Sequence, residues 1–379
     1  MLRQIGMPAM LLSARNFVYH VLRNLGGHPS VRWPLGAYLY VTYRCNLACR
    51  YCNDGLGNKY PDKRVDRELS TGEWITVLDL LRRVTDFLIV TGGEPSVRPD
   101  LADILAHARA VRYRPVSLLT NGLRLDTQLE LLKSVDILAV SLDTLDSGKG
   151  DAVMGMTGAH QRILRNLDLA CDLRRIHRFS LCVIACILPN TLDDVNAVLD
   201  YALERGIRFA PAPASGGTTP VPGLAGNPRY EAFIGRLIEL KRAGHPILGS
   251  LAFLEALQHF RPYRCLPTLL ARVKPNGELL YPCSKLFTTA GNLLEDGDYD
   301  RTAAEGVGRH GPIGHCSRHC HDGCYMDFSL LAQQPGRLLQ EVWLRIVRQP
   351  WRRAFLDRSG GESAARAPAR RIHHTPEPP

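Results

Sequence analysis

Residues 36–52 read GAYLYVTYRCNLACRYC, an apolar and aromatic run followed at once by three cysteines. The run over residues 37–43 has the composition of a β-strand, so Cys45, Cys49 and Cys52 are expected on a loop at its carboxyl end. Three thiolates this close together can hold one metal centre. Structural zinc usually takes four protein ligands, so three cysteines favour an iron–sulfur cluster with one open iron. A zinc site or a group of packed thiols is the alternative.

A strand–helix alternation continues from this first strand. Further strands are expected at residues 87–91, 116–120, 137–141, 179–188 and 207–210, and helices at residues 70–84, 99–110, 126–133, 158–174 and 192–205. Such an alternation predicts an α/β fold with a parallel sheet. Six β/α units suggest a partial TIM-like (β/α)6 barrel, followed by a C-terminal cysteine-rich auxiliary domain. In these sheets, ligands bind at the carboxyl ends of the strands.

A second motif, Thr91-Gly92-Gly93-Glu94-Pro95, ends the second expected strand. The two glycines would let a ligand approach the backbone closely, and Glu94 supplies a charge suited to an ammonium group. Alone, this motif is equally compatible with a plain turn. One β/α unit after the cysteine loop, it indicates a cofactor site.

Together, these motifs make residues 36–210 resemble the radical S-adenosylmethionine (radical SAM) enzymes. The resemblance implies that Cys45, Cys49 and Cys52 hold a [4Fe-4S] cluster. The other matching positions, expected to bind the cofactor, are Tyr51 near the adenine, Gly92, Gly93, Glu94 and Pro95 at the methionine amino group, and Asn121, Ser141 and Asp143 along the pocket. Around the last three residues, a turn or a capped helix start is nearly as good an explanation.

The resemblance also implies the chemistry. The reduced cluster passes one electron to the sulfonium of S-adenosylmethionine, and a 5′-deoxyadenosyl radical then abstracts a hydrogen atom from the substrate. A reductant such as flavodoxin or ferredoxin is implied as a partner. The sequence assigns no catalytic acid or base.

Five more cysteines follow the barrel region: Cys265, Cys283, Cys316, Cys320 and Cys324. Asn276-Gly277 between apolar runs predicts a hairpin that would bring Cys265 and Cys283 towards one centre. The region resembles the SPASM and twitch extensions of radical SAM enzymes, which bind auxiliary iron–sulfur clusters. Five cysteines are fewer than a full SPASM set, which favours one auxiliary [4Fe-4S] cluster.

Cys265 and Cys283 are the first ligands expected for that cluster, and the spacing leaves open which two of the other three complete it. A zinc site that uses His315, His319 or His321 is the alternative. Such a cluster either accepts an electron from a substrate radical, which makes the reaction an oxidation, or binds the substrate directly. Full ligation favours the electron role. Three remaining cysteines, Cys171, Cys182 and Cys186, are expected to be small buried hydrophobes.

The ends of the chain are basic. The 379 residues carry a formal net charge of +10, and the first 53 contain no Asp or Glu. Phe17, Val18, Val21, Leu22 and Leu25 fall at helical spacing, and Gly26-Gly27 should end that helix. The helix either packs on the domain or lies on an anionic membrane surface.

The expected organisation has six parts. They are a basic N-terminal segment (1–35), the barrel (36–210), a Pro/Gly-rich linker or loop (211–229), the auxiliary domain (230–335), a basic helix (336–358) and a disordered tail (359–379). A bilayer span needs about 18 apolar residues, and no such run is present. Without a signal peptide, and with clustered cysteines, the chain is expected in the cytoplasm, with a peripheral membrane location as the alternative.

Several functions compete. A peptide or protein substrate is favoured because SPASM and twitch enzymes are often peptide maturases, although only some 35 residues precede the barrel, too few for the leader-peptide domain that many of them carry. A small-molecule or lipid-linked substrate at a membrane surface is the alternative. Nucleic-acid binding is disfavoured because no basic stripe with interleaved aromatics is present. Glu94 and the three-cysteine loop disfavour a non-catalytic iron–sulfur electron carrier.

Overall fold

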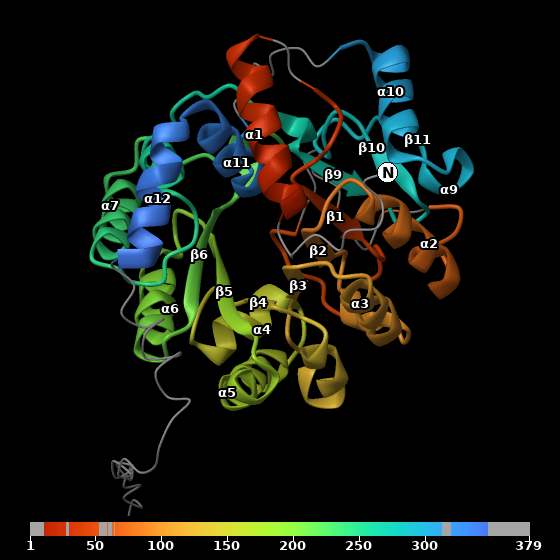
Figure 1. The fold of residues 1–379 in the computed structure, drawn as a ribbon. Helices are drawn as coiled ribbons and strands as arrows, with labels where there is room; N and C mark the ends of the chain where they lie inside the picture. Colours follow the sequence, from red (N-terminus) through yellow and green to blue (C-terminus); the bar gives the residue numbers. More distant parts are fainter. Residues whose placement is uncertain are drawn as a thin grey trace, which may run out of the picture.

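A nine-stranded sheet in the order β11-β10-β9-β1-β2-β3-β4-β5-β6 runs through the molecule (Figure 1). The structure, a computed structural model, describes residues 11–27, 30–52, 59, 63, 65–312 and 320–347. The first six strands are parallel: β1 (Gly36–Tyr40), β2 (Leu88–Thr91), β3 (Val116–Thr120), β4 (Ile137–Ser141), β5 (Ser180–Ile187) and β6 (Arg208–Pro213). The predicted α/β fold with a parallel sheet is confirmed. The sheet is open, with β6 and β11 at its ends.

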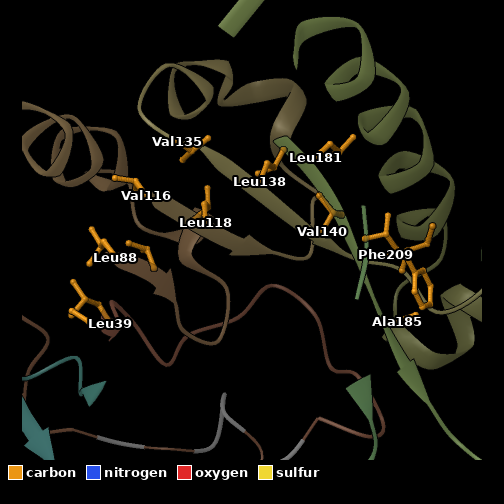
Figure 2. Close-up of a cluster of buried hydrophobic side chains, with 14 of the residues drawn as sticks. Leu39, Leu88, Val116, Leu118, Val135, Leu138, Val140, Leu181, Ala185 and Phe209 are labelled. Atoms are coloured by element: carbon orange, nitrogen blue, oxygen red, sulfur yellow. The ribbon is translucent and has the colours of Figure 1, made fainter. Parts of the chain in front are cut away.

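Helices follow the strands and cover the outer face of the sheet. They are α2 (Thr71–Arg82), α3 (Leu101–Ala110), α4 (Ser147–Met154), α5 (Ala159–His177) and α6 (Leu192–Glu204). Alternate strand residues point to opposite faces. Leu39, Leu88, Val140 and Leu181 therefore point outwards into the main hydrophobic core (Figure 2).

Two sequence predictions in this part need correction. Residues 126–133 form two short 3-10 helices, Leu125–Thr127 and Leu129–Lys133, instead of an α-helix. So short a connector gains little from α-helical cooperativity. The segment 211–229 is not all linker, because β6 extends to Pro213 and the short strands β7 (Ser215–Gly216) and β8 (Thr219–Pro220) pair with each other. Prolines are tolerated there because β6 lies at the edge of the sheet.

The C-terminal region continues the same sheet. The strand β9 (Leu270–Val273) pairs in parallel with β1, and β10 (Glu278–Leu280) and β11 (Thr289–Asn292) follow antiparallel. The hairpin predicted at Asn276-Gly277 is thereby confirmed. The helices of this half are α7 (Pro228–Arg242), α8 (Leu251–Gln258), α9 (Leu293–Asp296), α10 (Tyr299–His310), α11 (Gly323–Gln333) and α12 (Pro335–Val347), with a 3-10 helix at Pro267–Leu269.

The predicted N-terminal helix is α1 (Leu11–Leu25), and it packs on the domain. Its Asn16 side chain is buried and donates to the carbonyls of Pro34 and Val84. Phe17 and Val21 pack on a small apolar cluster beneath the helix. The predicted basic helix at 336–358 corresponds to α12, and residues 348–379, including the predicted tail, lie outside the described residues. No helix in the described part of the chain combines the length and apolarity needed to cross a membrane.

Candidate active site

The cysteine loop lies at the carboxyl end of β1. The thiols of Cys45, Cys49 and Cys52 are partly exposed. Backbone bonds from Ala48 to Met154 and from Arg50 to Val153 hold the loop against the end of α4. Burial raises the pKa of Cys49 to about 12, and the neighbouring Cys52 and Cys45 add to the rise. The three thiols are therefore close enough to influence one another, and metal binding would have to release their protons.

The loop offers three thiols as ligands for a metal centre. Within the described ranges, no three His, Cys, Asp or Glu side chains converge closely enough to hold one metal ion. A four-iron cluster takes each thiolate on a different iron, so its ligands are spread more widely than those of zinc. Three cysteines on one loop, with no fourth cysteine beside them in the sequence, fit a cluster with one open iron.

The Gly-Gly-Glu turn packs directly on this loop. The Gly93 N–H donates to the Thr42 carbonyl at 2.9 Å, and the Glu94 N–H donates to the Arg44 carbonyl at 2.8 Å. A Cβ at Gly92 or Gly93 would clash with the backbone oxygens of residues 42–44. The sequence predicted glycine here for the approach of a ligand. In the structure, the close approach is that of the cysteine loop itself.

Glu94 is buried, with 1% of its surface exposed. Its carboxylate accepts hydrogen bonds from the Ser96 N–H, the Thr120 hydroxyl and the Asn121 N–H, at 3.0, 2.7 and 2.6 Å. Burial raises the pKa of Glu94, and these hydrogen bonds oppose the rise. A carboxylate offers about four acceptor sites, so one remains for a further donor such as an ammonium group.

The next strands bring further predicted residues to the same edge. The Asn121 side chain donates to the Asn46 side chain at 2.8 Å, which ties the end of β3 to the cysteine loop. Asp143 follows β4 and accepts hydrogen bonds from the Tyr51 hydroxyl and from the Cys186 N–H. Burial raises the pKa of Asp143 to about 7. Ser141 is exposed at the end of β4.

Cys186 was missed by the sequence analysis as a neighbour of this site. It is half-buried on the inner face of β5. Burial raises the pKa of Cys186, and Asp143, Cys49 and Cys52 add to the rise. The prediction of a buried residue holds for Cys182 and is wrong for Cys186 and for Cys171, which is half-buried on α5. Cys186 is only partly buried because it lies near the carboxyl end of β5. Alternate residues of a strand share one face, and this alternation was the signal that could have placed Cys186 at the same edge of the sheet as Thr91 and Ser141.

The C-terminal cysteines come from three segments. Cys265 precedes β9, Cys283 follows β10, and Cys320 and Cys324 lie at the start of α11. Burial raises the pKa of Cys320 to about 11, and Cys283 contributes to that rise. Burial raises the pKa of Tyr263, and Cys265 and Cys320 add to the rise. The Tyr263 hydroxyl donates to the Cys320 carbonyl at 2.6 Å.

Two of the residues considered for a zinc site, His315 and His319, lie outside the described residues, as does Cys316. His321 is buried edge-on against Phe260, with ring centroids 5.0 Å apart. The described part of this region contains four cysteines, the number that one [4Fe-4S] cluster takes as ligands.

The fold and this edge of the sheet define a class, namely α/β proteins that bind a cofactor at the carboxyl ends of parallel strands beside a cysteine loop. Residues 39–202 match the Radical SAM superfamily, and this part of the chain is a radical SAM domain. The members of this superfamily are enzymes, and the family implies a [4Fe-4S] cluster and S-adenosylmethionine.

Three curated relatives illustrate the similarity. The chain is 31% identical to the molybdenum cofactor biosynthesis protein 1 of Bos taurus over 172 residues, which are 44% of this chain and 26% of that protein. It is 31% identical to the PqqA peptide cyclase of Bradyrhizobium diazoefficiens over 42% of this chain and 44% of the relative. It is 36% identical to the mycofactocin maturase MftC of Mycobacterium tuberculosis over 34% and 32%. The matched region therefore covers from 26% to 44% of the length of these relatives.

Solved structures share the fold over more of the chain. Streptococcus suis SuiB bound to S-adenosylmethionine superposes with a TM-score of 0.57 at 17% identity, over 85% of this chain and 76% of SuiB. Native anSMEcpe with bound AdoMet gives a TM-score of 0.54 at 16% identity, over 82% and 98%.

Proposed function

We propose that this chain is a radical SAM enzyme that oxidatively modifies a peptide or protein substrate with the help of one auxiliary [4Fe-4S] cluster. Residues 36–210, a partial barrel, hold the SAM chemistry, and residues 230–335 hold the auxiliary cluster. The observation that carries the proposal is the packing of the Gly92–Glu94 turn on the cysteine loop. This packing sets one carboxylate with a spare acceptor site beside the three-cysteine loop.

Each group of residues at the site has its own proposed role. When bound, the cluster and S-adenosylmethionine supply a radical that abstracts hydrogen from the substrate. Cys45, Cys49 and Cys52 would hold the cluster, and Glu94 would accept a hydrogen bond from the cofactor ammonium group. Tyr51, held by Asp143, would orient the adenine. Asn121 and Ser141 would line the remaining pocket.

The auxiliary cluster would be held by Cys265, Cys283, Cys320 and Cys324, with Cys316 as the alternative fourth ligand. Complete ligation by four thiolates leaves no iron open to substrate, which supports a role in accepting an electron. A flavodoxin or ferredoxin would reduce the first cluster. A cytoplasmic location fits these reduced cofactors.

A peptide substrate is supported by the relatives. One curated relative is a PqqA peptide cyclase, and the SuiB fold has also been solved with a bound precursor peptide, SuiA. This chain covers less than half of the length of the curated relatives, so the substrate class is to be tested by experiment.

A second candidate is a lipid-linked substrate at an anionic membrane surface. It is favoured by one face of α1, where Val18, Leu22 and Leu25 are 57%, 64% and 69% exposed. The exposed Arg15 and Arg23 flank this stripe. Apolar side chains flanked by arginines suit the boundary between headgroups and acyl chains.

The test is 5′-deoxyadenosine formation by the anaerobically reconstituted full chain with dithionite and S-adenosylmethionine. The reaction is run alone, with host peptides and with host lipids. We expect formation that is stimulated by peptides and abolished in the Cys45, Cys49, Cys52 triple Ala variant. Stimulation by lipids alone would favour the second candidate. No product from protein with an intact cluster would contradict both and favour an electron carrier.

Binding to vesicles separates the two candidates further. If α1 meets a membrane, substituting Val18, Leu22 and Leu25 by Gln should abolish co-sedimentation with phosphatidylserine vesicles. Ile176→Gln is the matched control, because Ile176 is 71% exposed on α5. Equal sedimentation of both variants would argue against the lipid-linked candidate.

A further inference from the structure

Arg272 is a buried cation between the parallel sheet and the C-terminal cysteines. It lies on β9 opposite Tyr38 of β1, and only 3% of its surface is exposed. A buried charge is costly unless it is paired and hydrogen-bonded. Its surroundings should therefore account for each of its donors.

Most of the guanidinium is satisfied. One terminal nitrogen donates to the Tyr40 hydroxyl at 3.1 Å and to the Ser284 hydroxyl at 2.9 Å, and the other donates to Asp322 at 3.2 Å. The rings of Tyr38 and Tyr325 lie 4.5 and 4.0 Å from its central carbon, so cation–π contacts add to these bonds.

One of the three nitrogens has no partner among the described residues. It is the buried Nε of Arg272. An unpaired buried donor is costly, so it calls for a missing partner. The missing partner has to be an acceptor, because a guanidinium nitrogen can only donate.

The residues around Arg272 are neighbours of cysteines. Ser284 directly follows Cys283, and Tyr325 directly follows Cys324. Asp322 lies between Cys320 and Cys324, and its N–H donates to the Cys320 sulfur at 3.4 Å. The contacts of Arg272 therefore converge on the surroundings of three of the four candidate ligands.

We propose that Arg272 is a positioning residue for the auxiliary cluster, to which it supplies an N–H···S hydrogen bond from Nε and a buried positive charge that raises the reduction potential. This inference rests on the proposed function, because it requires the cluster. Each added electron makes a cluster more negative, so a nearby cation in a region of low dielectric favours the reduced form. A higher potential suits a cluster that accepts an electron from a substrate radical.

The test uses the full chain with Cys45, Cys49 and Cys52 replaced by Ala, so that only the auxiliary cluster contributes to the spectrum. Its reduction potential is measured by EPR-monitored titration. We expect Arg272→Met to shift the potential to more negative values and Arg272→Lys to give a smaller shift in the same direction. Asp322→Asn removes a negative charge and should shift it to more positive values. Arg236→Met, an exposed cation on α7, should leave it unchanged.

A second measurement tests the hydrogen bond. With ¹⁵N-labelled arginine, the parent should show a nitrogen hyperfine coupling to the reduced cluster, and Arg272→Lys should lack it. Absence of this coupling in the parent would overturn the hydrogen bond.

Iron content separates this inference from the proposed function. A parent without iron would overturn the auxiliary cluster, and the inference with it. A parent with a cluster whose potential stays the same in Arg272→Met, Arg272→Lys and Asp322→Asn would overturn only the role of Arg272. If Arg272→Met fails to retain iron, the other two variants decide by the sign of their shifts.

Discussion

The two cysteine groups of this chain are built in different ways. Cys45, Cys49 and Cys52 lie on one loop after β1. The C-terminal cysteines come from three separate segments, and Arg272 contacts two of those segments. The first group depends on local sequence and on the edge that every parallel β/α sheet provides. The second depends on long-range packing, so it should be the more sensitive to changes in the surrounding core.

The largest expected effect comes from removing one group at a time. Alanine at Cys45, Cys49 and Cys52 should abolish 5′-deoxyadenosine formation and leave the auxiliary EPR signal. Alanine at the four described C-terminal cysteines should remove that signal and leave cleavage of S-adenosylmethionine. Iron content and product analysis check both, with Cys171→Ala as the control that loses neither. If either set of substitutions removes both clusters, the two groups are not independent.

At the first group, Asp143 should produce a pH-dependent stability. Burial raises its pKa from 3.8 to about 7, so the folded state holds this proton more tightly than the unfolded state. The wild type should therefore lose stability relative to Asp143→Asn as the pH rises from about 4 to about 7, by at most roughly 4 kcal/mol. Urea denaturation of the metal-free protein across this range measures the difference.

The control is Asp103→Asn, which changes an exposed carboxyl on α3. It measures the effect of losing one exposed carboxyl, against which the change in Asp143→Asn is judged. A stability difference for Asp143→Asn that does not change with pH would mean that Asp143 is not held in the buried contacts with Tyr51 and Cys186.

In the C-terminal half, Lys241 of α7 and Glu341 of α12 form a buried ion pair at 3.2 Å. Glu341 also accepts a hydrogen bond from the Leu251 N–H at 2.6 Å, which ties α12 to α8. Lys241→Met should lower the free energy of unfolding by about 3 kcal/mol, because it leaves a buried carboxylate without its cation. Chemical denaturation checks this value.

Lys149→Met is the matched control. Lys149 is 60% exposed and pairs with Asp194, so its loss should cost far less than the loss of Lys241. Equal losses of stability in the two variants would show that the buried Lys241–Glu341 pair contributes no more than an exposed pair.

The smallest expected effect is at Ser70, the N-cap residue of α2. Its hydroxyl accepts from the Glu73 N–H, and Glu73 accepts in return from the Ser70 N–H. Ser70→Ala should cost about 1 kcal/mol of stability without loss of iron from either group. Thr76→Ala, at an exposed position within α2, should cost nothing because alanine is the better helix former. A loss of iron in Ser70→Ala would show that both groups depend on this one helix end.

The parallel strands were predictable because buried strands are short apolar runs that end in glycine, proline or polar residues. The cysteine loop and Glu94 were predictable because their spacing is local. The extension of β6 to Pro213 was not, since proline normally argues against a strand and only its edge position permits it. Arg272 was not predictable either, because a single arginine in an apolar strand gives no sign of the distant Asp322 and Tyr325 that surround it.

The pairing of β9 with β1 has a consequence for biosynthesis. On the ribosome, the strand that carries the cysteine loop emerges early, whereas its partner at Leu270–Val273 emerges only after the whole β2–β6 series. Contacts between such distant segments form slowly. Until then, β1 is an exposed sheet edge of the kind that promotes aggregation. The nascent chain therefore exposes this edge until Leu270–Val273 has been synthesised.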